Sequence, residues 1–277
     1  MGLRISTNLS SLSAQRVLAG NQEQGGKSMT RLASGDRITS AADDAAGLSI
    51  SERLRGQIKS VKQAQRNAND GISFIQVAEG GLSEVSNSLI RMRELAVQAA
   101  SDTIGDRERG FMDEEVKQLK VEIDRIADST NFNGTNLLNG EAKKGTLEFQ
   151  VGANNTESDR INYHVGQFNI KTDNIGIDDT NLLDIEAARD SMDQVDKALD
   201  KINGFRANLG AMQNRLHSTS NSLGINIESI SAANSRIRDT DIAEESAELV
   251  KRNILNSASV AVLAQANQVP AQALRLL

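Results

Sequence analysis

Two lines of apolar residues recur every seven positions, one in each half of the chain. Seven residues make two turns of a slightly underwound α-helix, so each line predicts a seam along which a helix packs against a partner. With 38% apolar residues, a run of seven has a chance of about one in a thousand per starting position, so two runs are hard to attribute to chance. The lines are Leu54, Val61, Ala68, Ile75, Leu82, Leu89 and Ala96, and Val195, Ile202, Leu209, Leu216, Leu223, Ile230 and Ile237.

The composition favours slender helices over a thick globular core. Aromatic residues make up only 3% of the chain, although bulky rings fill core volume efficiently. The chain holds a single proline, Pro270, so almost nothing forces a helix to break. We therefore expect an all-α-dominated fold, an elongated antiparallel coiled-coil or helical-bundle rod, with a small β-hairpin region at the middle of the chain.

Composition and motifs argue against several classes of function. The chain has no cysteine, which excludes thiolate chemistry, and its net charge of −6 argues against a nucleic-acid-binding surface. The sequence contains no apolar run long enough for a membrane span, and its start does not resemble a cleavable signal peptide. Neither His164 nor His217 has a partner at metal-ligand spacing, and the common phosphate-loop, dinucleotide and hydrolase motifs do not occur. We expect no catalytic, cofactor-binding or metal-binding residue, and therefore no enzyme.

Changes in periodicity divide the chain into five segments. Helical spacing fills both halves, and a turn-rich stretch with period-two alternation separates them. We interpret the outer segments as terminal helices, the two long segments as halves of a rod, and the middle segment as a β-hairpin region. The segments are residues 1–43, 44–130, 131–185, 186–240 and 241–277.

The terminal segments carry shorter seams. Ile5, Leu9 and Leu12 form one in the first helix, and either Ser40 or Asp43 is expected to cap the long helix that follows. In the last helix, large apolar residues repeat every seven positions and alternate with small ones. The two neighbouring positions in phase with this repeat on the chain are polar, so we expect the seam to need a partner from elsewhere and to hold subunits to each other. The repeat is Leu255, Val262, Val269 and Leu276.

The first long segment contains one irregularity. The spacing between its successive seam residues alternates between four and three positions, but two successive spacings of three meet at Ala78, beside Gly80 and Gly81. Such a step overwinds a coiled coil locally, but the glycines can equally be incidental in a helix that drifts. After a short link at 101–106, a third helix is expected to return antiparallel to the second.

Alternating apolar and polar residues predict a hairpin in the middle segment. Leu147 and Phe149 alternate with polar neighbours, as do Ile161 and Tyr163, and residues 152–155 supply the turn. An isolated hairpin is marginal in water, so it should lie on the helices. The order of the segments would bring the chain ends together and place the middle at the far tip.

Four stretches occur in an order that forms a specific signature. They are Ser34–Ile38 with Ala41–Leu48, Arg93–Ala100, Asn131–Gly134, and Val262–Pro270 followed by Leu276–Leu277. This signature resembles the two ends of bacterial flagellins, and the resemblance covers nearly the whole chain outside residues 140–185.

The resemblance implies a structural subunit that self-assembles into the bacterial flagellar filament for motility. It implies export in an unfolded form by the flagellar type III system, and therefore a secreted, extracellular protein. The terminal helices would pair and line the filament channel, and the long helices would form a rod outside them. The implied partners are other copies of the chain, an export chaperone, and hook-associated and cap proteins; no cofactor is implied.

The resemblance also implies recognition by the vertebrate Toll-like receptor for flagellin. The residues that match the family's receptor-contact stretch are Arg91, Glu94 and Leu95, with Glu115 on the next helix. Arg91 and Glu94 fit an ordinary solvated helix face equally well.

Two other functions remain open from the residues. A hook–filament junction protein has similar helical ends, although the stretches 93–100 and 264–270 favour a flagellin. A coiled-coil adaptor would need only the seven-residue repeats.

Overall fold

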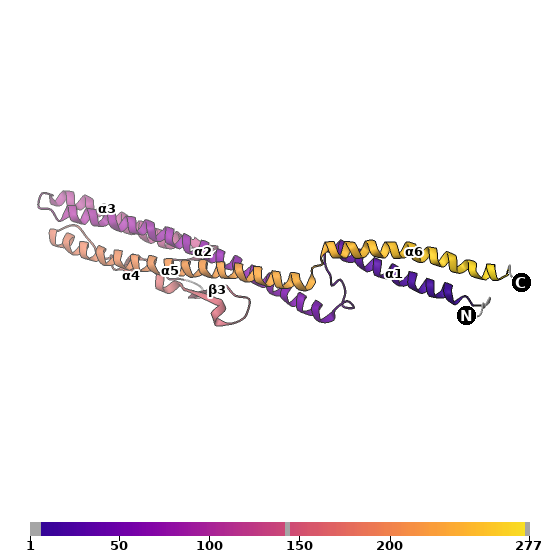
Figure 1. Cartoon of the computed structure of the whole chain (residues 1–277). Helices are drawn as coiled ribbons and strands as arrows, with labels where there is room; N and C mark the ends of the chain where they lie inside the picture. The colour runs from indigo at the N-terminus through magenta and orange to yellow at the C-terminus, as the bar shows by residue number, and fades with distance from the viewer. Residues whose placement is uncertain (1–6, 142–144, 275–277) are drawn as a thin grey trace. The chain divides into compact units, whose positions relative to one another are not determined.

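The computed structural model describes residues 7–141 and 145–274, and long helices dominate it (Figure 1). This confirms the predicted all-α-dominated fold with a small β region in mid-chain. The elements are α1 (Leu9–Ser34), α2 (Ala45–Ala99), α3 (Asp106–Ser129), β1 (Asn131–Phe132), β2 (Thr135–Asn136), β3 (Thr146–Gln150), η1 (Glu157–Asp159), β4 (Arg160–His164), η2 (Val165–Phe168), α4 (Thr172–Ile175), α5 (Ile185–Arg238) and α6 (Ile242–Leu274).

The described chain divides into two compact units. One combines residues 1–58 with 228–277, and the other is residues 59–227. The first unit therefore contains α1 and α6 with one end each of α2 and α5. The second contains the rest of those two long helices, together with α3 and the β elements. The two units are described separately below.

In the unit 59–227, α2 and α5 pack antiparallel to one another. Arg93 pairs with Asp196 at 2.6 Å, and the Gln65 side chain donates to the carbonyl oxygen of Ser220 at 3.3 Å. Residue numbers rise along one helix as they fall along the other, which defines an antiparallel pair. From Ala68 onward, the buried apolar residues of α2 belong to one core cluster with those of α5.

The helix α3 returns beside α2, as the short link predicted. Arg91 on α2 pairs with Glu115 on α3 at 2.9 Å. The link itself is held by Arg109, which is only 5% exposed and donates to the carbonyl oxygens of Ala99 at 2.9 Å and Ser101 at 3.1 Å. A buried guanidinium needs such acceptors, so Arg109 is part of the turn's structure.

The predicted hairpin is present and lies on the long helices, as expected, but it does not form the far tip. Strands β3 and β4 are antiparallel, with Leu147 opposite Tyr163. The Phe74 ring of α2 lies 4.9 Å from the ring of Tyr163, and Asn67 donates to the carbonyl oxygen of Gln150 at 2.9 Å. The hairpin thus folds back along the long helices (Figure 1). The expectation of a far tip was wrong because the hairpin's apolar face is buried against the side of α2, away from the α2–α3 link.

A second, smaller hairpin follows α3. Asn133 and Gly134 connect β1 to β2 with φ of 50° and 75°, the positive values that a two-residue type I′ turn requires. Gly81 of α2 faces this region, because a Cβ there would lie 2.7 Å from Leu138. Gly81 is therefore not incidental: it allows the chain after α3 to approach α2 closely.

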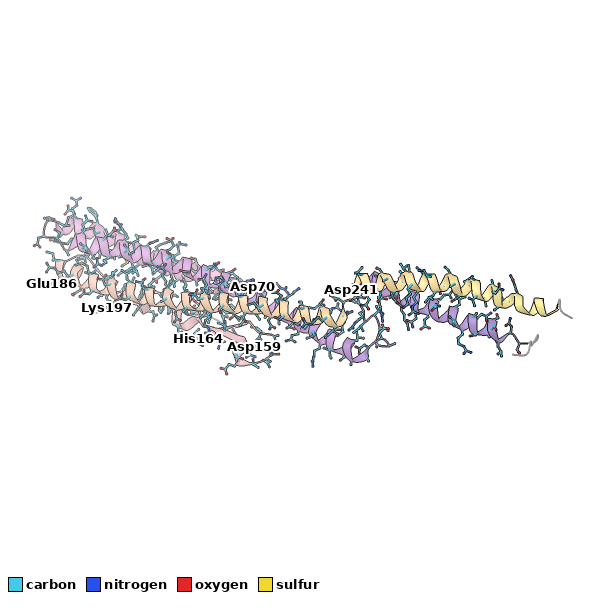
Figure 2. All side chains as sticks on the ribbon, viewed as in Figure 1. Asp70, Asp159, His164, Glu186, Lys197 and Asp241 are labelled. Atoms are coloured by element: carbon cyan, nitrogen blue, oxygen red, sulfur yellow. The ribbon has the colours of Figure 1, made fainter. Side chains whose placement is uncertain are left out.

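In the other unit, the start of α2 corrects one prediction. The Asp44 carboxylate accepts from the backbone N–H of Gly47 at 2.8 Å, so Asp44 caps α2. Asp43 instead accepts from the hydroxyl of Thr39 and from the backbone N–H and hydroxyl of Ser40; these hydrogen bonds close a turn inside the connector and lower the pKa of Asp43. The expectation that Ser40 or Asp43 caps α2 was wrong, because these two residues hydrogen-bond to one another inside the connector. Asp241, labelled in Figure 2, caps α6 in the same way as Asp44 caps α2, through the N–H of Ala243 at 2.8 Å.

Candidate assembly surface

Helices α1 and α6 pack antiparallel, so both ends of the described chain lie on one helix pair. Asn8 donates to the carbonyl oxygen of Ala266 at 2.8 Å at one end of the pair. Arg31 and Glu245 come within 3.7 Å at the other end. The expectation that the two terminal helices pair with one another is met in the structure.

The contact between α1 and α6 follows a line that hydrophobic periodicity did not reveal. On each helix, most of the buried and half-buried residues repeat with alternating steps of three and four, and only two residues of each line are large and apolar. The lines are Ser11, Ala14, Leu18, Asn21, Gly25, Ser28 and Leu32 on α1, and Glu245, Leu249, Arg252, Asn256, Ser259, Leu263 and Ala266 on α6. We call these two lines together the inner seam.

Hydrogen bonds hold much of the inner seam. The Ser11 hydroxyl donates to the amide oxygen of Asn267 at 2.8 Å, and Asn21 donates to Ser259 at 3.4 Å. The amide oxygen of Asn256 is buried without a hydrogen-bond partner in the described part of the chain. Because an unpaired buried polar atom costs free energy, the inner seam is a weaker contact than an apolar one.

Apart from the four leucines of the inner seam, the described large apolar side chains of the two helices are exposed. Leu9 is 66% exposed, Leu12 55% and Val262 58%, and Leu255 is 37% exposed. These four residues belong to the predicted terminal seams, and we call this exposed apolar surface the outer face. Ile5 and Leu276 lie outside the described residues, and Val269 is described only as part of the α6 backbone. Further exposed residues are Val17, Met29, Ile242, Val250, Ile254 and Val260.

The predicted rod seams behave differently. From Val61 to Ala96 on α2 and from Val195 to Leu216 on α5, the seam residues are at most 2% exposed; the seam residues outside these stretches are half-buried. The buried residues are Val61, Ala68, Ile75, Leu82, Leu89, Ala96, Val195, Ile202, Leu209 and Leu216. The half-buried residues are Leu54, Leu223, Ile230 and Ile237.

The structure brings together the charged members of the predicted receptor stretch. Arg91 contacts Glu94 at 3.1 Å and Glu115 at 2.9 Å, and these two carboxylates raise the pKa of Arg91. All three side chains are about half exposed. Leu95 faces the opposite way and is 2% exposed, so in this structure its side chain supports the core and is not offered to a partner.

Side chains of α3 and α5 hydrogen-bond to the backbone between η2 and α5. We call these residues, 169–184, the return segment. On α3, buried Asp113 accepts from the N–H of Leu182 at 2.9 Å, and Asp124 accepts from the N–H of Thr172 at 2.9 Å. On α5, Lys201 donates to the carbonyl oxygen of Asn174 at 3.0 Å. Hydrophobic periodicity cannot find these contacts, because they join polar side chains to an irregular backbone.

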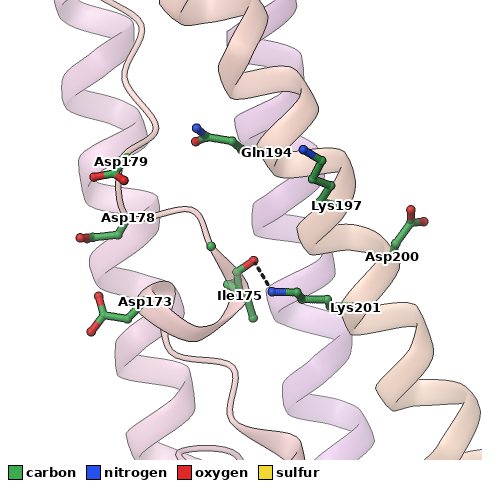
Figure 3. A pocket seen from close by; sticks show the side chains of 9 residues that line it. Asp173, Ile175, Asp178, Asp179, Gln194, Lys197, Asp200 and Lys201 are labelled. Atoms are coloured by element: carbon green, nitrogen blue, oxygen red, sulfur yellow. Dashed lines mark hydrogen bonds between the residues drawn. The ribbon is translucent and has the colours of Figure 1, made fainter.

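A shallow cavity of about 700 Å³ lies between this segment and α5 (Figure 3). Its lining includes Asp173, Asp178, Lys197 and Lys201. Lys201 is occupied by backbone carbonyls, including that of Ile175 at 3.3 Å. Among the residues that the structure describes, no group of three or more histidine or acidic side chains could hold a metal ion. Within those same ranges, no helix has the length and apolar character needed to span a membrane.

Comparison with known families gives two matches that cover most of the chain. Residues 5–143 match the bacterial flagellin N-terminal helical region, and residues 192–277 match the bacterial flagellin C-terminal helical region.

Individual relatives agree with the family matches. A flagellin of Halalkalibacterium halodurans is 44% identical over 273 residues, which cover 99% of each chain. The flagellar filament 33 kDa core protein of Treponema phagedenis is 41% identical over 287 residues, again covering 99% of each chain. The crystal structure of Bacillus cereus flagellin is 36% identical with a TM-score of 0.50, and the match covers 57% of this chain and 88% of that one. The chain therefore belongs to the bacterial flagellin family.

Proposed function

We propose that this chain is the structural subunit of a bacterial flagellar filament and that copies join through the outer face of α1 and α6. The observation that carries this proposal is the outer face itself. Leu9, Leu12 and Val262 are all more than half exposed on a helix pair whose inner seam is largely polar. Large exposed apolar surfaces mark contacts with other molecules, and a polymer of identical copies buries such a surface on every subunit.

Residues 1–43 and 241–277 then form the core of the filament, and residues 44–130 with 186–240 form the rod outside it. Residues 131–185 fold onto the rod. This assignment is supported by the family matches at both ends of the chain and by the pairing of α1 with α6. The filament would be extracellular, and its subunits would leave the cell through the flagellar type III system with an export chaperone. Hook-associated and cap proteins would contact the two ends of the filament.

Seeded polymerisation tests this function. Purified monomer mixed with filament fragments should elongate them into long fibres visible by electron microscopy. Deletion of 241–277 should leave a folded, soluble protein that does not elongate seeds. Failure of the full chain to elongate seeds, or growth of long filaments by the truncated chain, would contradict the proposal. An adaptor would form no fibres, and a hook–filament junction protein would form no long ones.

A matched pair of substitutions tests the outer face itself. Leu12→Asp places a charge on the surface that would be buried between copies, so elongation should be lost. Leu12→Met keeps the volume and apolar character, so elongation should persist. Equal behaviour of the two variants would show that Leu12 lies outside the contact.

We also propose that Arg91, Glu94 and Glu115 contact the vertebrate Toll-like receptor for flagellin. Support comes from their exposure and from the ion pairs that hold Arg91 between the two carboxylates. Arg91→Ala should weaken signalling in receptor-reporter cells at least fivefold, while Lys59→Ala, an exposed change elsewhere on α2, should not. Equal signalling by both variants would show that Arg91 is not part of the receptor contact.

A further inference from the structure

The last residue of α5, Arg238, joins three separate segments of the chain. Its Nε donates to the carboxylate of Asp36 at 3.0 Å, and a terminal guanidinium nitrogen donates to Glu52 at 2.5 Å. Asp36 belongs to the connector after α1, and Glu52 lies near the start of α2. One side chain therefore fastens the end of α5 to the connector and to α2.

Backbone hydrogen bonds surround this guanidinium. Asp36 and Asp239 form an isolated antiparallel bridge, in which the N–H of Thr240 donates to the carbonyl oxygen of Gly35 at 2.9 Å. The Arg37 guanidinium donates to the carbonyl oxygen of Ile237 at 2.8 Å. Both passages of chain between the terminal helix pair and the long helices thus meet at one point. We call this point, residues 35–37 with 237–240, the junction.

The chemistry of arginine suits this position. Isolated ion pairs at an exposed surface contribute little, but a planar guanidinium that meets two carboxylates from different segments fixes their mutual geometry. The Arg238 side chain is 20% exposed and the Asp36 side chain 30%, so solvent screens the contact only in part. A lysine ammonium is a single point charge and cannot present the same fork to both carboxylates.

We propose that Arg238 is a positioning residue that locks the junction, so that every copy offers its terminal helix pair to the polymer in one orientation. This inference rests on the proposed filament function. Without the lock, the two connections would sample several arrangements, and fewer encounters between a monomer and the filament end would lead to addition.

Hydrogen exchange of the junction, read by mass spectrometry, tests the lock in both monomer and filament. In Arg238→Gln, amides of residues 35–44 and 237–241 should exchange roughly fivefold faster than in the wild type, and seeds should elongate more slowly. The amide exchange and the elongation rate of Arg238→Lys should lie between those of Arg238→Gln and those of the wild type. Arg236→Gln, an equal change of charge on an exposed side chain of the same helix, should match the wild type.

The outcomes separate this inference from the filament function. Wild-type monomer that fails to elongate seeds would contradict the filament function, whereas the exchange of the junction would still report on the lock. If Arg238→Gln exchanges and elongates like Arg236→Gln, the lock does not exist. If the arginine were needed only for its charge, Arg238→Lys would equal the wild type, and the positioning role would be overturned.

Discussion

The α2–α5 pair and the α1–α6 pair are both antiparallel and both carry seven-residue repeats, yet they bury opposite kinds of residue. In the unit 59–227, the apolar repeat faces the partner helix: Val195 is 1% exposed and Ile202 is fully buried. In the terminal pair, the inner seam is largely small and polar, whereas Val262 of the apolar repeat is 58% exposed.

This difference separates two ways of using the same pattern. A buried apolar seam makes a helix pair stable within one molecule, because each large side chain leaves water on folding. A polar inner seam with an apolar outer face makes a pair that is marginal alone and gains its apolar burial only from other copies. A polar residue at a seam position also favours one partner and register at a cost in stability.

The largest expected effect comes from shortening a buried side chain of the α5 seam. Ile202→Ala removes a fully buried side chain and should lower the free energy of unfolding by about 2–5 kcal/mol. Ile225→Ala makes the same chemical change on the same helix, but Ile225 is 68% exposed, so it should cost well under 1 kcal/mol. Urea denaturation of the two monomers measures both values. Similar losses of unfolding free energy in the two variants would contradict the claim that this seam stabilises the subunit.

A smaller effect, of opposite sign, is expected in the inner seam. Asn256→Leu replaces a buried amide oxygen that has no hydrogen-bond partner, so the α1–α6 pair should gain about 1 kcal/mol or more. Amides of α1 and α6 should then exchange several-fold more slowly. Asn253→Leu, at an exposed position of the same helix, is the control and should leave exchange unchanged. Faster exchange in Asn256→Leu would mean that the polar seam stabilises the pair.

The smallest expected effect is a loss of stability at low pH. The hydrogen bond from Arg93 lowers the pKa of Asp196, and this pair joins α2 to α5. A carboxyl whose pKa is lower in the folded state contributes stability above its unfolded pKa, and that contribution is lost as the pH falls through the folded value. The pKa of Glu248 is lowered by Lys251 and Arg252, which lie on its own helix. Acidification below about pH 4 should therefore weaken the α2–α5 contact directly but affect α6 only locally.

Asp196→Asn checks this prediction. Its free energy of unfolding should be lower than that of the wild type at neutral pH, and the two should converge as the pH falls. Parallel pH curves for the two proteins would contradict the role given to the Arg93–Asp196 pair.

Apolar periodicity predicted much of the fold but less of the assembly surface. It located the long helices and their seams, and period-two alternation located β3 and β4 through residues such as Phe149 and Tyr163. It did not place the hairpin against Phe74, because that contact joins residues far apart in sequence. It could not identify the inner seam either, since Ser11, Asn21 and Ser28 give no apolar signal.

The junction was beyond prediction for a related reason. The sequence held several arginines and carboxylates near the segment boundaries, and nothing in their spacing distinguished Arg238 from Arg236 or Asp44 from Asp43. Which of them pair depends on how the backbone of the connector turns, and that geometry appears only in three dimensions.

The comparison between the two helix pairs can be tested with one chemical change made at two places. Val195→Ala and Val262→Ala are both compared with the wild type in two measurements, the free energy of unfolding of the monomer and the critical concentration for seeded elongation. We expect Val195→Ala to lower the free energy of unfolding by about 2 kcal/mol and to leave the critical concentration nearly unchanged. Val262→Ala should leave the monomer unchanged and raise the critical concentration roughly tenfold, which corresponds to about 1.4 kcal/mol of lost burial between copies. If Val262→Ala instead destabilised the monomer and left the critical concentration unchanged, the outer face would not be the surface that joins the subunits.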